Sequence, residues 1–164
     1  MSAPITRRRA LAYSAAAFAP VVVPKALFAA ASHTVQMLNI HPENQRLRQV
    51  FFPRVLVVQP GDTVTFLATD RGHNSASIEG MIPEGAEAWN GRINEEIAVT
   101  LDRPGFYGYV CTPHASVGMV GLIAVEGDGM MDNLEAAQAV RQRGRAQQAW
   151  EEIWSEVAGM GLTG

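Results

Sequence analysis

The sequence contains one cysteine, one lysine and no long uninterrupted apolar segment. A single cysteine cannot form an internal disulfide, which excludes a disulfide-stabilised scaffold. A membrane-spanning helix needs about 20 consecutive apolar residues, and prolines or polar residues break every apolar stretch here before that length. The 164 residues are sufficient for one domain with a hydrophobic core and additional segments at its ends.

The N-terminus has the organisation of an export signal. Residues 7–9 are three arginines, residues 10–23 form an alanine-rich apolar stretch, and three alanines at 29–31 offer a cleavage site. A membrane anchor or an unstructured tail is the alternative. We expect residues 1–31 to be a signal peptide that is cleaved on export. Residues 6–11 are also similar to a twin-arginine signal, although the aromatic residue of that pattern is missing.

The predicted signal contains much of the positive charge. Its removal takes away four of the 13 basic residues, including the single lysine, and none of the 16 acidic residues. The mature chain would keep nine arginines against those 16 acidic residues, a formal net charge of −7. Nucleic acids and anionic membranes bind basic surfaces. We therefore expect no nucleic-acid partner and no insertion of the mature chain into a membrane.

Short apolar segments separated by turn signals dominate residues 32–127. Polar and apolar residues alternate along several of them, as in strands with one buried face. Pro-Gly pairs at 60–61 and 104–105 mark turns. This pattern predicts an all-β domain, either a sandwich or a barrel. The expected strands are residues 35–40, 54–59, 62–69, 96–101, 106–110 and 120–125.

Residues 128–164 change to a helical pattern. Asp132 or Asn133 can cap a first helix, and Gly144 separates it from a second. We interpret both helices as an extension that covers one face of the β domain. A membrane or partner helix is disfavoured because three glutamates of the second helix would repel an anionic bilayer. Apolar residues recur at helical spacing in that helix, at positions 146, 149, 150, 153 and 157.

Cys111, His114 and Met119 place three metal-binding side chains in one short loop. Thiolate and thioether sulfurs select Cu(I), and imidazole suits copper in general. Taken singly, a buried cysteine, a surface histidine and a core methionine are ordinary, but their coincidence within nine residues favours a metal. One Cys, two His and a weak axial Met form the copper site of electron-transfer proteins.

Such a site needs a second histidine, and His73 is the candidate. It follows the third expected strand, so its loop and the cysteine loop can meet at one end of a sandwich. Pro113 restricts the chain just before the histidine of the cysteine loop, and Gly118 permits an unusual backbone angle before the methionine. A stiff loop would keep the ligands in place when copper changes charge.

Other functions of these residues are less consistent with the sequence. A redox enzyme would need an open coordination position or a second metal. We interpret His33, beside the predicted cleavage site, as part of a frayed terminus, and His41 as a surface residue of a polar loop. A zinc site or a Cys111–His114 hydrolytic pair leaves Met119 without a role. A copper-storage or copper-chaperone protein, expected to contain more clustered Met or Cys, is the alternative to a one-electron carrier.

Five further stretches of the chain have distinctive residue patterns. They are residues 35–39 (Val-Gln-Met-Leu-Asn), 60–66 (Pro-Gly-Asp-Thr-Val-Thr-Phe), 72–74 (Gly-His-Asn), 81–87 (Met-Ile-Pro-Glu-Gly-Ala-Glu) and 93–95 (Ile-Asn-Glu). Together with the cysteine loop, they resemble the pseudoazurins, a family of cupredoxins from bacterial periplasms. The resemblance implies a Greek-key β-sandwich followed by two α-helices. It also implies one type 1 copper ion per chain, a periplasmic location and an electron carrier rather than an enzyme.

The resemblance also assigns roles to single residues. His73, Cys111 and His114 would be the equatorial copper ligands, and Met119 would be the weak axial ligand. Asn74 would connect the two ligand loops and donate its backbone N–H to the cysteine sulfur. Such a donor stabilises the thiolate and tunes the reduction potential.

The same family implies how partners bind. The ring of His114 would lie at the surface in an apolar patch, where a transient redox partner such as nitrite reductase or nitrous oxide reductase docks on the monomeric protein. The patch would include Pro113, Ala115 and Val117. A ring of lysines usually guides this docking, but here only Arg71 and Arg92 keep positive charge at such positions. Because complementary charge mainly sets encounter rate and partner choice, the sequence leaves the partner open.

Overall fold

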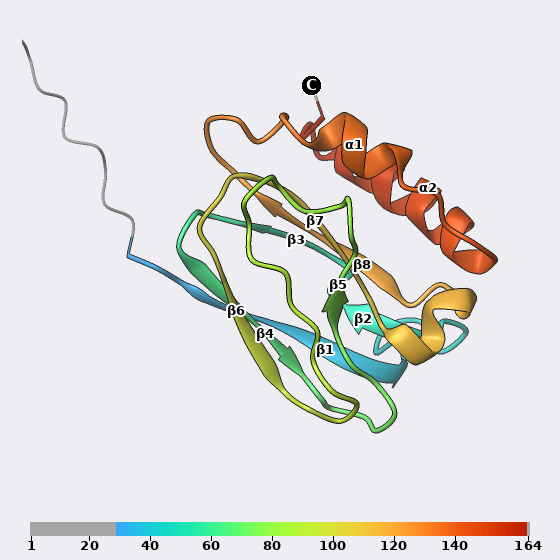
Figure 1. Ribbon diagram of the computed structural model, residues 1–164. Coiled ribbons are helices and arrows are strands. Elements are labelled where there is room, and N and C mark those ends of the chain that lie inside the picture. Colours follow the sequence, from blue (N-terminus) through green and yellow to red (C-terminus); the bar gives the residue numbers. More distant parts are fainter. Residues whose placement is uncertain (1–28, 164) are drawn as a thin grey trace, which may run out of the picture.

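The protein is a β-sandwich with helices at its C-terminus, described by a computed structural model for residues 29–163 (Figure 1). Most of the predicted signal peptide, residues 1–28, lies outside the described residues. Two four-stranded sheets have the orders β2-β1-β4-β6 and β3-β8-β7-β5. The strands are β1 (Ser32–Ile40), β2 (Arg48–Phe52), β3 (Val55–Val58), β4 (Asp62–Leu67), β5 (Ala76–Ser77), β6 (Ile97–Leu101), β7 (Gly105–Val110) and β8 (Val120–Val125). The predicted sandwich is confirmed; the chain divisions at residues 31 and 127 stay predictions.

Two parallel strand pairs connect distant parts of the chain. β1 pairs with β4, with Val35 opposite Phe66, and β3 pairs with β8. The other neighbours within each sheet are antiparallel. Parallel neighbours end on the same side of a sheet, so the carboxyl ends of β1 and β4 lie at one end of the sandwich. The loop that carries His73 starts at that end.

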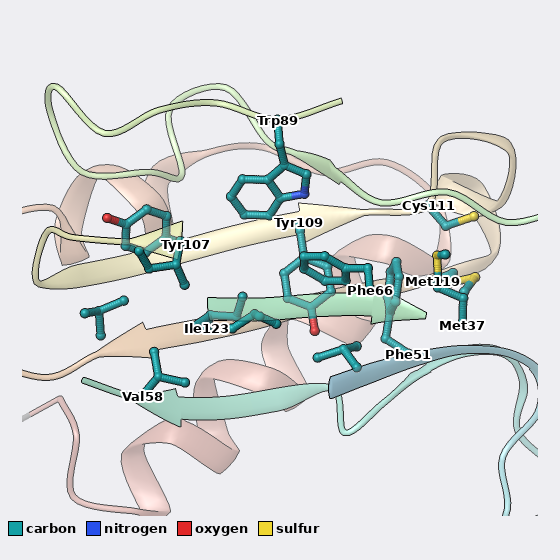
Figure 2. Close-up of a cluster of buried hydrophobic side chains, with 14 residues drawn as sticks. Met37, Phe51, Val58, Phe66, Trp89, Tyr107, Tyr109, Cys111, Met119 and Ile123 are labelled. Carbon is teal, nitrogen blue, oxygen red and sulfur yellow. The ribbon is translucent and has the colours of Figure 1, made fainter. Parts of the chain in front are cut away.

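The core between the sheets follows the alternation seen in the sequence. In β4, Val64 and Phe66 are fully buried, whereas Thr65 between them is partly exposed, which agrees with the expected alternation. The ring of Phe66 packs edge-on against Tyr109 at 4.9 Å, and Phe51 packs on the same tyrosine at 4.8 Å (Figure 2). Burial of each such side chain contributes about 1.5–3 kcal/mol. The aromatic cluster therefore fixes the two sheets against each other.

The C-terminal helices cover the outer face of the second sheet (Figure 1). They are α1 (Leu134–Ala139) and α2 (Arg145–Gly159). All six residues of β8 are buried, because one face of this strand lies in the sandwich core and the other packs against α2. In α2, the predicted apolar positions Trp150, Ile153 and Val157 are buried. Among the described residues, no helix has both the length and the hydrophobicity needed to cross a membrane.

Asn133, one of the two predicted caps, has a different role in the structure. It occupies the N-cap position of α1, but its side chain makes no capping hydrogen bond. Instead, its Nδ2 donates to the carbonyl of Phe106 at 2.8 Å, and its Oδ1 accepts from the N–H of the same residue at 2.9 Å. The asparagine side chain thus pairs with the backbone of β7 as a neighbouring strand would. This pairing attaches the start of α1 to the sheet.

The predictions missed two strands and misplaced one histidine. β2 and β5 are edge strands; β2 contains Arg48 and Gln49, and β5 has only two residues, so neither shows a readable alternation. The interpretation of His33 as part of a frayed terminus is wrong. His33 lies within β1, partly buried, with its Nε2 2.9 Å from the carboxylate of Asp62. His41 does lie in a loop, where its Nδ1 accepts backbone N–H groups.

Candidate metal centre

The cysteine loop closes tightly between β7 and β8. Cys111 directly follows β7 and Met119 directly precedes β8, and the Cys111 N–H donates to the Met119 carbonyl at 3.0 Å. Between them, Thr112–Val117 form a short 3₁₀ helix, η1. The turn back into β8 requires Gly118, whose φ of 92° is left-handed and disfavours side chains with a Cβ. A Cβ there would also lie 3.2 Å from the carbonyl oxygen of Arg145 in α2.

The loop that carries His73 is held by the chain segment after Trp89. The carbonyl of His73 accepts from the N–H of Asn94 at 2.8 Å, and the carbonyl of Ser75 accepts from the N–H of Gly91 at 2.9 Å. The indole of Trp89 donates to the Ser75 hydroxyl at 3.0 Å. These contacts bury His73, which has no exposed surface. The histidine is therefore fixed before any metal binds.

Three of the predicted ligands converge. The ligand atoms of His73, Cys111 and His114 all lie within 4.8 Å of one another. The Cys111 Sγ is 3.3 Å from Nδ1 of His114 and 3.7 Å from Nδ1 of His73, and the two Nδ1 atoms are 3.2 Å apart. Sulfur and nitrogen atoms bound to one metal at about 2.0–2.3 Å lie about 3–4 Å from each other. The donor set thus has the spacing and the soft character that fit copper.

Met119 is placed beside this group. It is fully buried, as is Cys111, and both belong to the core cluster of the sandwich. Figure 2 shows the two side chains at the same end of that cluster. The four predicted ligands thus come from two loops that meet at one end of the fold, as the strand pattern predicted.

Asn39, which the sequence did not single out, orients one imidazole. Its Oδ1 lies 3.1 Å from Nε2 of His73. Because a carbonyl oxygen can only accept, this contact places the ring proton on Nε2 and leaves the Nδ1 lone pair directed at Cys111. The backbone N–H of Asn39 donates to the carboxylate of Asp70 at 2.7 Å. The sequence offered one signal for this role: Asn39 is a polar residue near the end of β1, the strand that pairs with β4.

Asn74 connects the two ligand loops. Its Oδ1 accepts from the Thr112 N–H at 2.8 Å, and its Nδ2 donates to the Thr112 hydroxyl at 3.1 Å and to the Gly91 carbonyl at 3.0 Å. The side chain is buried; its bond to the Gly91 carbonyl is fully buried, and its two bonds to Thr112 are partly buried. Thr112 is the residue after the cysteine, and the asparagine therefore fixes Cys111 relative to His73.

The surroundings set the protonation of the donors. Burial raises the pKa of the Cys111 thiol, while the backbone N–H groups of Asn74 and His114 oppose this rise. Burial first, and then the nearby His114, lower the pKa of His73. A lowered pKa favours the neutral imidazole, which is the form that binds metals. The thiol, by contrast, needs a cation nearby to lose its proton readily.

Only one of the three clustered donors approaches the surface. His73 and Cys111 have no exposed surface, whereas His114 is partly exposed. Around it, Pro113 is exposed, Ala115 is partly exposed and Val117 is 45% exposed. Arg71 and Arg92, the two predicted basic positions, are exposed as well. The centre thus opens to solvent at the His114 edge through a small apolar area.

Comparisons with known proteins agree with this geometry. Residues 35–126 match the family of copper binding proteins described as the plastocyanin/azurin family. The pseudoazurin of Paracoccus pantotrophus is 37% identical over 147 residues, which cover 90% of this chain and 96% of that protein.

Solved structures give the same result. A pseudoazurin from Sinorhizobium has a TM-score of 0.72 and 46% identity, covering 77% of this chain and 96% of its own. The pseudoazurin from Methylobacterium extorquens AM1 has a TM-score of 0.70 and 38% identity, with coverage of 77% and 98%. The sandwich is therefore of the cupredoxin type. This chain belongs to the pseudoazurins, copper-binding electron carriers of the plastocyanin/azurin family, and not to a family of enzymes.

Proposed function

We propose that the protein is a periplasmic one-electron carrier whose single type 1 copper is bound by His73, Cys111, His114 and Met119. The convergence of one thiol and two imidazole Nδ1 atoms within 4.8 Å carries this proposal. The membership of the chain in a family of copper electron carriers supports it. The three arginines and the apolar stretch at the N-terminus support export to the periplasm.

The residues around the donors favour fast electron transfer. Copper supplies the redox chemistry by alternating between Cu(I) and Cu(II). Asn74 holds the cysteine loop, and Asn39 holds the ring of His73. Because these hydrogen bonds fix the donors without a metal, the side chains need to move little when the charge of the centre changes. A small rearrangement keeps the barrier to electron transfer low.

The His114 edge is the proposed route for the electron. It is the partly exposed member of the clustered donors, and the residues beside it are apolar or small. A partner that covers this area excludes water and brings its own redox centre close to the imidazole. We propose that the monomer binds transiently there to a reductase, with nitrite reductase and nitrous oxide reductase as the candidate acceptors. Pro113 belongs to this docking area.

A copper-storage or copper-chaperone role is the second candidate. Storage requires several metal-binding groups, and among residues 29–163 the His, Cys, Asp and Glu side chains form one group close enough to hold a metal. A chaperone must also release its ion, whereas His73 and Cys111 are fully buried. Both observations favour the carrier.

Absorption spectroscopy tests the copper site. The copper-loaded protein should show an intense visible band from thiolate-to-copper charge transfer, which one electron per chain bleaches. Cys111→Ser should abolish the band, while Ser116→Ala, an exposed change in the same loop, should leave it intact. A band that survives Cys111→Ser would exclude the proposed ligand set.

Stopped-flow oxidation of the reduced protein by each candidate reductase tests the partner. Attraction through Arg71 and Arg92 predicts rates that fall between low and high salt, as the Debye length decreases from about 30 Å at 0.01 M to about 3 Å at 1 M. A rate that does not respond to salt would show that these arginines do not guide docking. No electron transfer to either reductase would exclude both acceptors but not the copper site.

A further inference from the structure

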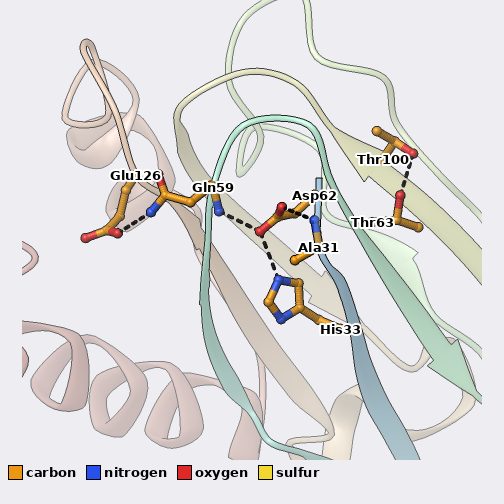
Figure 3. A network of polar contacts seen from close by, with 7 residues as sticks. All are labelled: Ala31, His33, Gln59, Asp62, Thr63, Thr100 and Glu126. Carbon is orange, nitrogen blue, oxygen red and sulfur yellow. Dashed lines mark hydrogen bonds and ion pairs between the residues drawn. The ribbon is translucent and has the colours of Figure 1, made fainter. Parts of the chain in front are cut away.

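A buried carboxylate lies at the other end of β4 from the loop that carries His73. Asp62 begins this strand, and only 4% of its surface is exposed. Its Oδ1 accepts from the backbone N–H of Ala31 at 2.7 Å, and its Oδ2 accepts from the N–H of Gln59 at 2.9 Å and lies 2.9 Å from Nε2 of His33 (Figure 3). Three donors from two chain segments thus surround one carboxylate.

The carboxylate lacks a permanently charged partner. Within residues 29–163, its one ion-pair partner is His33, which is charged only when its ring is protonated. The hydrogen bonds from the Gln59 and Ala31 backbone and then from His33 lower the pKa of Asp62 and keep it ionised. A buried charge is costly unless a group of opposite charge neutralises it. Hydrogen bonds thus stabilise the ionised carboxylate, but no permanently charged group among residues 29–163 neutralises it.

Ala31 is the first of the described residues 29–163 for which hydrogen bonds to the sandwich are present. Its N–H donates to Asp62, and its carbonyl accepts from the N–H of Thr63 at 2.9 Å. β1 begins at the next residue, with Ser32 opposite Thr63. Ala29, Ala30 and Ala31 are all exposed and precede β1; Ala31 differs from the other two by these hydrogen bonds to β4. Among residues 29–163, the hydrogen bonds of this segment to β4 therefore start at the nitrogen atom of Ala31.

We propose that export processing hydrolyses the Ala30–Ala31 peptide bond and that the new α-ammonium group of Ala31 pairs with the carboxylate of Asp62. Water adds across the bond, so that Ala30 receives a carboxylate and Ala31 an ammonium group. The nitrogen that lies 2.7 Å from Oδ1 thereby changes from a neutral amide to a cation. A charge-assisted bond of this kind is about twice as strong as a neutral one. This inference rests on the proposed export.

The proposal moves the predicted cleavage position by one residue. The alanines at 29–31 favour cleavage after Ala31, which would leave Ser32 as the first residue. That cut would remove the donor to Oδ1 of Asp62 and the acceptor for the N–H of Thr63. A cut before Ala30 would keep both hydrogen bonds but leave the nitrogen of Ala31 uncharged. Only cleavage between Ala30 and Ala31 places a new cation, the α-ammonium group of Ala31, against the buried carboxylate.

The cleavage position is tested with the full chain expressed in an exporting bacterium. Intact-mass measurement and N-terminal sequencing of the periplasmic protein should give Ala31 as the first residue. A first residue other than Ala31 would overturn the inference and leave the copper proposal intact. Full-length protein retained in the cytoplasm would overturn both this inference and the proposed location. The visible copper band, recorded on the same samples, reports independently on the metal site.

The ion pair is tested by comparing chains that begin at Ala31 and at Ala30, each with and without Asp62→Asn. The Ala30 chain is the matched control, because it keeps the Ala31 hydrogen bond as a neutral amide. With Asp62 present, the folding equilibrium constant of the Ala31 chain should be about five- to tenfold larger. In the Asp62→Asn background, this advantage should disappear. Equal effects in both backgrounds would overturn the pair.

A second measurement uses the unsubstituted chain, so its result does not depend on whether a variant folds. The α-amine of Ala31, labelled with ¹⁵N, can be titrated by NMR in the otherwise unchanged chain, while the ring signals of His33 are followed separately. Pairing with Asp62 should raise the pKa of the Ala31 α-amine above the usual α-amine range of about 7.7–8.0. A value within that range would overturn the proposed contact.

Discussion

The two ends of β4 show two opposite uses of buried polar groups. At the amino end, backbone N–H groups and an imidazole surround the carboxylate of Asp62, and each polar atom has a partner. Past the carboxyl end, the Nδ1 atoms of His73 and His114 face each other and the sulfur of Cys111. The first arrangement saturates a buried charge, whereas the second directs several electron-rich atoms at one point. The difference separates a structural polar site from a site built for a metal ion.

Both ends depend on hydrogen bonds between distant segments, but these bonds act on different groups. At the metal centre, the asparagines at 39 and 74 bond to the outer nitrogen of an imidazole and to the backbone beside the cysteine. These hydrogen bonds leave free the lone pairs of the metal-binding atoms. At Asp62, the hydrogen bonds go to the charged atoms themselves. Substitutions at the two ends should therefore separate stability from metal binding.

The largest effect is expected for Asn74→Ala, which breaks the connection between the two ligand loops. It removes three hydrogen bonds, one buried and two partly buried, and leaves the Thr112 N–H and the Gly91 carbonyl without this partner. At about 1 kcal/mol for each bond, the free energy of unfolding should fall by about 3 kcal/mol, measured by urea denaturation of the metal-free protein. The visible copper band should also shift or broaden.

Asn90→Ala is the matched control for this prediction, because Asn90 is exposed and lies in the neighbouring segment. Its free energy of unfolding and copper spectrum should remain close to those of the unchanged protein. If Asn74→Ala also left both quantities unchanged, the two loops would be held together by packing alone.

Asp62→Asn should affect stability at the other end without affecting copper. The pKa of Asp62 is lowered in the folded protein, mainly by the backbone of Gln59 and Ala31. Its stabilising contribution is therefore complete above the ordinary carboxyl pKa of about 3.9 and is lost as the pH falls through the lower folded value. The variant should lose about 2 kcal/mol at pH 7, and this difference should shrink below pH 4.

Denaturation curves between pH 7 and pH 3 measure this effect, with the exposed Asp128→Asn as the control. The copper spectrum of both variants should match that of the unchanged protein. A pH-independent difference between the unchanged protein and Asp62→Asn would mean that packing, and not the charge of the carboxylate, stabilises this end.

The smallest effect on folding is expected for Asn39→Ala, which removes the acceptor for Nε2 of His73. The free energy of unfolding should fall by only about 1 kcal/mol, since Asn39 is exposed. Copper affinity should fall by about 10- to 100-fold, because the imidazole loses its orientation. Competition with a copper chelator measures this loss, and Asn39→Asp, which keeps an acceptor, should restore most of the affinity. An unchanged affinity in Asn39→Ala would show that the ring is fixed by burial alone.

The sequence was sufficient for features that depend on local spacing. The alternation of polar and apolar residues predicted a strand with one buried face at residues 62–69, and the apolar positions of α2 predicted its contact face. Two of the four edge strands, β2 and β5, could not be predicted in the same way. β2 begins with the polar pair Arg48 and Gln49, and β5 has only two residues, so neither has a readable alternation and pairing with a neighbouring strand decides that they become strands.

The polar contacts were harder to predict than the strands. His33 looked like a terminal residue, because nothing near it in the sequence indicates that Asp62 lies beside it. Asn39 looked like an ordinary strand residue, and Asn133 looked like a helix cap. In each case the side chain bonds to a residue far along the chain, and only strand pairing or helix packing brings that partner close.

The sequence by itself determined the chemistry of the loop between β7 and β8. A thiol, an imidazole and a thioether within nine residues restrict the metal to a soft or borderline ion wherever the loop lies. The tertiary structure decided which histidine joins them, which ring nitrogen faces the cysteine, and which carboxylate receives Ala31. These contacts join residues 29 to 41 positions apart. Their formation depends on the parallel register of β1 and β4 and on the meeting of two loops, which no local pattern specifies.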